Sequence, residues 1–129
     1  MTPDEILRKA ASLIQERGLA KSTIEDEKGC VCSIGALRLA AYGSTHPPLP
    51  IRTLWLIEDP VTGHNKQNPE PPPGYEGYSA ACIALRDEIR LIGAGSGSIP
   101  EWNDMPSRSQ RAVVQTMYEA ANRYQREHS

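Results

Sequence analysis

The chain has 129 residues and a mass of 14.2 kDa, which is the size of one domain with one hydrophobic core. A hydrophobic content of 39% with 23% charged residues excludes a fully disordered chain, while 11 prolines and 10 glycines indicate irregular stretches. Fourteen basic and sixteen acidic residues give a formal charge of -2, which excludes a whole-molecule field that attracts nucleic acid or anionic membranes. We therefore expect a single domain over 1-129.

Location and redox state are predicted from apolar runs and cysteines. No apolar run reaches the length of a membrane-spanning helix, and residues 1-20 lack the order of segments that marks a signal peptide. Three cysteines, two of them separated by one residue, fit no secreted disulfide framework and are spaced too closely for a typical zinc site. We expect a cytoplasmic protein with free thiols, no membrane association, no metal and no cofactor.

The first predicted helix spans 3-17. Thr2 and Glu5 form a capping box around a proline at the first helical position, and Gly18 supplies the stop. The polar stretch 20-31 that follows allows two very short strands, which would form a minor β-hairpin, or plain loop.

The second predicted helix spans 34-42, with Ser33 as its cap and Gly43 as its stop. Apolar residues cover nearly its whole circumference, and Arg38 is its one charge. This pattern predicts a buried central helix.

Residues 44-77 interrupt the helical pattern with many prolines, and the run 69-74 favours an extended, solvated chain. We interpret this region as an irregular excursion that exposes Tyr75, Tyr78 and Trp55.

Two more helices are predicted, over 79-92 and 109-127, joined by a glycine-rich connector. The predicted fold is therefore mainly α, a compact bundle of about four helices around 34-42. The last helix carries arginines opposite its apolar side, namely Arg108, Arg111, Arg123 and Arg126.

Two motifs suggest a family. The sequence C-S-I-G-A at 32-36 opens the buried helix, and S-I-P-E-W-N-D at 98-104 precedes Arg108 and the last helix. Together with the first helix, they resemble an uncharacterised family of actinobacteria and their phages, known only as a domain of unknown function. The resemblance is weakest across 44-77. It implies an actinobacterial or phage source, and it supplies no activity and no catalytic residues.

Cys32 and Asp104 are candidate catalytic residues. A thiol at a helix start can be activated by unpaired amides and the positive end of the helix dipole. A nucleophilic cysteine also needs a general base, and His46, His64 and His128 lie in the irregular region or at the terminus. We therefore favour a buried structural thiol and a protein that is not an enzyme, with catalysis as the alternative.

Trp102, Asn103 and Asp104 form the most informative local cluster. An indole buries a large area, an asparagine holds turns and an aspartate accepts backbone amides, so the three can build a ligand-binding corner. They can equally build a rigid corner without a ligand, and this is the interpretation we favour.

The leading functional hypothesis is a small non-catalytic interaction protein, such as a phage protein that binds a host protein in the cytoplasm. One alternative is a small enzyme or ligand-binding domain with a cleft near Cys32 and 102-104. Another, less favoured, is a nucleic-acid-binding module that uses the arginines of the last helix. The candidate binding residues are Trp102, Asn103, Asp104, Arg108, Tyr75 and Tyr78.

Overall fold

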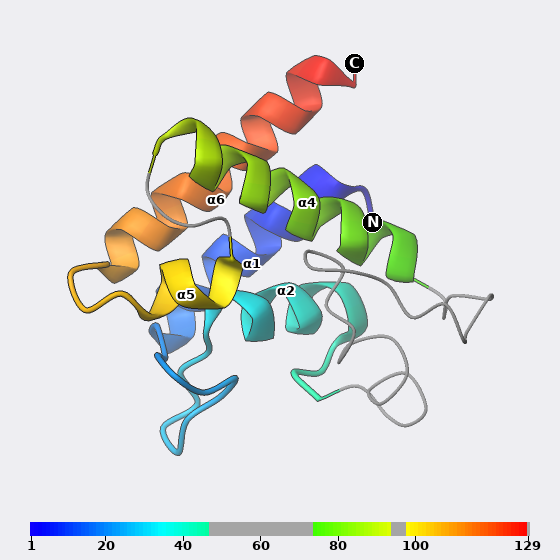
Figure 1. Ribbon diagram of the computed structural model, residues 1–129. Coiled ribbons are helices and arrows are strands. Elements are labelled where there is room, and N and C mark those ends of the chain that lie inside the picture. Colours follow the sequence, from blue (N-terminus) through cyan, green and yellow to red (C-terminus); the bar gives the residue numbers. More distant parts are fainter. Residues whose placement is uncertain (47–73, 94–97, 129) are drawn as a thin grey trace, which may run out of the picture.

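The structure, a computed structural model, describes residues 1–46, 74–93 and 98–128 and forms five helices in these ranges (Figure 1). The mainly α bundle predicted from the sequence is confirmed. The helices are α1 (Pro3–Arg17), α2 (Ser33–Tyr42), α4 (Tyr75–Leu91), α5 (Ile99–Asp104) and α6 (Gln110–Glu127).

Helix α1 has the predicted bounds. The Thr2 hydroxyl oxygen accepts a hydrogen bond from the Glu5 amide, and the Thr2 amide donates to Glu5 Oε1 at 2.8 Å. At the other end, the Gly18 amide donates to the Ile14 carbonyl at 2.7 Å. Local capping chemistry therefore sets both ends of this helix.

Helix α2 begins one residue earlier than predicted, and its cap is Cys32 rather than Ser33. Cys32 Sγ accepts a hydrogen bond from the Gly35 amide at 3.3 Å. Ser33 does not cap, because its hydroxyl donates instead to Asn103 Oδ1 at 2.6 Å. A tertiary contact therefore displaces the local cap.

Helix α4 begins at Tyr75, four residues before the predicted start, and the expected exposure of Tyr75 and Tyr78 is wrong. The two residues are 9% and 1% exposed. The Tyr78 ring lies 5.6 Å from that of Tyr42 and 6.5 Å from that of Tyr75, between ring centroids. Burial of these rings favours an earlier helix start after Gly74, which has a φ of 84°. The predicted excursion therefore ends before Tyr75 rather than at 77, and its residues 47–73, Trp55 among them, lie outside the described residues.

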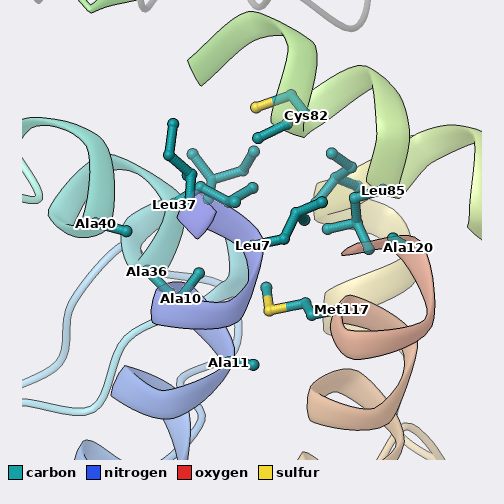
Figure 2. Close-up of a cluster of buried hydrophobic side chains, with 14 of the residues drawn as sticks. Leu7, Ala10, Ala11, Ala36, Leu37, Ala40, Cys82, Leu85, Met117 and Ala120 are labelled. Atoms are coloured by element: carbon teal, nitrogen blue, oxygen red, sulfur yellow. The ribbon is translucent and has the colours of Figure 1, made fainter. Parts of the chain in front are cut away.

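The core lies where α1 packs against α2, α4 and α6. Figure 2 shows Leu7 of α1 between Leu37 of α2 and Leu85 of α4, with Met117 of α6 nearby, and all four are 0% exposed. Helix α2, predicted as the buried central helix, buries residues 33–37 and Ala40 and packs against α1, α4 and α5, while α1 packs against α2, α4 and α6.

Helices α5 and α6 complete the bundle. The predicted corner at 99–104 is itself a short helix with Ser98 as its N-cap, and α6 begins after its cap, Ser109. Helix α6 is tied to α4 by an ion pair in which Arg123 Nε lies 2.7 Å from Oε1 of Glu88, a carboxylate that is 3% exposed. Arg108 lies before the N-cap Ser109, so it is not on the arginine face that the sequence predicts for the last helix.

The segment between α1 and α2 folds back on itself through single β-bridges. Val31 pairs in parallel with Leu19 and antiparallel with Glu25. In the part of the chain that the structure describes, these bridges take the place of the minor β-hairpin considered above.

Among the described residues, no helix combines the length and the apolar character that crossing a bilayer requires.

Candidate ligand-binding site

Asn103 joins three segments that are far apart in the sequence. Its Oδ1 accepts hydrogen bonds from the Ser33 amide at 2.8 Å and from the Ser33 hydroxyl at 2.6 Å. Its Nδ2 donates to the Ala20 carbonyl and to Asp104 Oδ1, both at 3.0 Å. The side chain is 1% exposed and uses both of its donors and both lone pairs. The two motifs of the sequence therefore meet at this residue, where α5 lies beside the start of α2 (Figure 1).

Gly35 allows the α1–α2 segment to lie directly on α2. A Cβ atom at this position would stand 2.5 Å from the Ile24 carbonyl oxygen and 3.1 Å from Ile24 Cγ2. The same carbonyl accepts a hydrogen bond from the Cys32 amide at 3.1 Å. Only glycine leaves room for this close approach.

Ser22 is held in an unusual backbone conformation beside α5. Its φ of 63° is the one positive value at a non-glycine residue in the described part of the chain. Its amide donates to Asp104 Oδ1 at 2.8 Å. Lys21, in the same segment, donates a hydrogen bond to the Met105 carbonyl and another, at 2.7 Å, to the Arg108 carbonyl. Backbone strain of this kind is typical of ligand sites.

These segments enclose a cleft of about 360 Å³, which we call the α2–α5 cleft. Volumes of this size are at the small end for ligand pockets. Its walls come from the α1–α2 segment and from helices α2, α4 and α5. The lining residues are Ser22, Thr23, Ile24, Cys32, Ile34, Arg38, Tyr78, Pro100, Asn103 and Asp104.

One cation and one carboxylate line the cleft. Arg38 Nε donates to the Tyr78 hydroxyl oxygen at 3.3 Å, and burial raises the pKa of Tyr78 well above its usual value, so its hydroxyl is neutral. Asp104 is held by the Ser22 amide and by Asn103 Nδ2, both on Oδ1. The cleft therefore presents both signs of charge on residues fixed by hydrogen bonds.

Cys32 is 8% exposed and protonated at neutral pH. Burial is the main cause that raises the pKa of its thiol, while the amides of Gly35 and Ile34 act in the opposite direction. Among the charged groups, Arg38 lowers the pKa of Cys32 and Asp104 raises it. The thiol is therefore not the activated thiolate that a cysteine nucleophile requires.

Trp102 and Arg108 support the site from outside the cleft. Trp102 is 1% exposed, and its carbonyl accepts a hydrogen bond from Arg108 Nε at 3.1 Å. The Arg108 guanidinium lies 5.3 Å from the centroid of the indole ring, within the range of a cation–π contact. Both residues fix the turn between α5 and α6.

Of the residues proposed from the sequence, the cleft brings together Cys32, Asn103, Asp104 and Tyr78. Tyr75, Trp102 and Arg108 lie outside its lining, as do His46 and His128, while His64 is outside the described ranges. Sequence reasoning missed the other lining residues. Three of them carried a signal, because Arg38 is the one charge on an otherwise apolar helix and Ile34 and Pro100 lie within the motifs at 32-36 and 98-104. The lining residues without a signal are Ser22, Thr23 and Ile24.

No group of three or more His, Cys, Asp or Glu side chains that could hold a metal ion occurs within residues 1–46, 74–93 and 98–128.

Comparison with protein-family models identifies the family of the chain. Residues 1–123 match the model of DUF6197, described as a family of unknown function. No curated protein and no solved structure matches the chain.

Proposed function

The chain belongs to the DUF6197 family, and we propose that it is a non-catalytic binding domain whose ligand occupies the α2–α5 cleft. The observation that carries this proposal is the convergence of sequence-distant segments on one hollow. Asn103 uses all of its hydrogen bonds to hold the walls together, and Asp104 keeps Ser22 in its strained conformation beside them. A prearranged hollow with fixed polar groups favours recognition of a small molecule.

A fragment screen by ¹H–¹⁵N NMR on the full chain tests the proposal. We expect the bound fragments to shift the amide signals of Ser22, Thr23 and Ile24. Thr23→Trp should weaken this binding by filling the cleft, because Thr23 lines it. Ser12→Trp, at an exposed position on α1, is the control and should leave binding unchanged. Fragment binding confined to other surfaces, or unaffected by Thr23→Trp, would contradict the proposal.

The enzymatic alternative is tested by the reactivity of Cys32. Because the thiol is buried and its pKa is raised, we expect a thiol reagent to label Cys32 slowly in the native protein at neutral pH. Labelling should become fast after unfolding in urea. Peptide mass spectrometry distinguishes Cys32 from Cys30 and Cys82. Fast native labelling of Cys32 would favour a nucleophilic role instead.

Binding of a protein partner is a second candidate function. The last residues of α4 favour it, because Leu91 is 62% exposed and the following Ile92 is 47% exposed. In this candidate function, the chain is a phage protein, and its partner is a host protein in the cytoplasm. When the wild-type chain is the bait in an affinity capture from an actinobacterial lysate, one partner protein should be recovered in every repeat. The Leu91→Glu variant should not recover that partner. Equal recovery by both would contradict this candidate.

A further inference from the structure

The two charges in the α2–α5 cleft have opposite signs and are close to the same thiol. Arg38 and Asp104 both influence the pKa of Cys32, in opposite directions, and no other charged side chain of the described residues lines the cleft. The formal charges of the lining therefore cancel. A ligand with charges of one sign only would be attracted by one of these groups and repelled by the other.

Each charged group can bind a ligand in addition to its protein partners. A guanidinium carries five N–H donors in a planar fork, so Arg38 can add a carboxylate to the partners that it already has, the Tyr78 hydroxyl among them. Within the described residues, the hydrogen bonds of Asp104 fall on Oδ1, and Oδ2 can accept from an ammonium group. The neutral Cys32 thiol adds no charge between them.

The remaining walls favour a small aliphatic body. Ile24, Ile34 and Pro100 contribute apolar surface, and the volume of about 360 Å³ suits a small molecule. We propose that the ligand is a small zwitterion of amino-acid size, with its carboxylate at Arg38, its ammonium at Asp104 and an aliphatic side chain against Ile24 and Ile34. This inference rests on the proposed function and specifies its ligand class.

The test compares three probes that share one aliphatic part and differ in their charged groups. They are leucine, 4-methylpentanoate, which lacks the amine, and 3-methylbutylamine, which lacks the carboxylate. NMR titration of the full chain gives the dissociation constant of each. We expect leucine to bind at least about tenfold more tightly than either analogue, because a hydrogen bond to a charged group typically contributes this much.

Two variants assign the charges. Asp104→Asn keeps an acceptor for the Ser22 amide and should remove the advantage of leucine over 4-methylpentanoate. Arg38→Gln should remove its advantage over 3-methylbutylamine. Asp87→Asn and Arg86→Gln are matched controls, because this ion pair on α4 lies outside the cleft, and both should bind leucine as the wild type does.

Equal binding of all three probes, no binding of leucine, or unchanged selectivity in Asp104→Asn and Arg38→Gln would each overturn the inference. If fragments still bound in the cleft, the proposed function would stand without the zwitterion. If nothing bound there, both would fail. Thermal unfolding of each variant distinguishes a lost contact from a lost fold.

Discussion

Asn103 shows how one side chain can determine the position of a site. Its amide is buried and joins α5, the first residue of α2 and the α1–α2 segment. The neighbouring Asp104 can face the cleft only because this junction fixes the end of α5. Asn103 therefore has a structural role, while Asp104 can contact a ligand in the cleft.

We predict that Asn103→Ala lowers the free energy of unfolding by about 3 kcal/mol, because it leaves the Ser33 amide and the Ala20 carbonyl unpaired in the interior. Urea denaturation measures the loss. Asn122→Ala is the control, since Asn122 is exposed and accepts one hydrogen bond from Arg8, and its effect should stay within about 0.5 kcal/mol. Equal effects of the two substitutions would contradict the assigned role.

Trp102 is the largest fully buried side chain described. Trp102→Ala should lower the free energy of unfolding by about 3–5 kcal/mol, which is typical for removal of a buried ring. Trp102→Phe should cost clearly less, because a ring remains and the indole Nε1 has no hydrogen-bond partner to lose among the described residues. The denaturation midpoints check both. An unchanged midpoint in Trp102→Ala would place the indole outside the core.

At the level of elements, three residues of the C-S-I-G-A motif make different contacts. Cys32 caps α2, Ser33 contacts α5 and Gly35 admits the carbonyl of Ile24. Helix α2 therefore serves as the platform on which the α1–α2 segment and α5 are both mounted. Capping and helix periodicity explain why the helix forms, but they do not explain these contacts.

Gly35→Ala tests this platform. In an exposed helix the change would add about 1 kcal/mol of stability, but here the new Cβ would stand 2.5 Å from a backbone oxygen. We expect a net loss of stability and a shift of the Ser22 and Ile24 amide signals in NMR spectra. Gly77→Ala, whose nearest contacts are at 3.2 Å, should be milder. A stabilised Gly35→Ala protein would contradict the close packing.

At the level of the whole molecule, three neutral acidic groups are withdrawn from water, with Tyr78 and Cys32 buried and Tyr42 half-buried. Burial raises the pKa of Tyr42 to about 12, that of Tyr78 well above its usual value, and that of the Cys32 thiol. Raised folded-state values mean that the unfolded chain loses these protons first as the pH increases. Their contribution to stability is complete below the unfolded values, about 8.5 for cysteine and about 10 for tyrosine.

We therefore predict that the urea midpoint falls steadily above about pH 8.5 and continues to fall towards pH 12. Tyr42→Phe should make this decline shallower. It should change little at pH 7, because the Tyr42 hydroxyl has no hydrogen-bond partner among the described residues. Circular dichroism at a series of pH values measures both effects. A midpoint that stays constant from pH 8 to 11 would contradict the prediction.

The sequence by itself determined the helical class and the ends of α1, because capping, amphipathic periodicity and glycine stops act within a few residues of the chain. It also indicated the two motifs at 32-36 and 98-104. Only the tertiary structure decided that Ser33 bonds to Asn103 rather than capping α2, that Tyr75 and Tyr78 are buried, and which residues line the cleft. These features depend on contacts between segments separated by about 80 positions, as in Ser22 with Asp104 and Ala20 with Asn103. Local propensity contains no information about such contacts, because their energies arise only when packing brings the segments together.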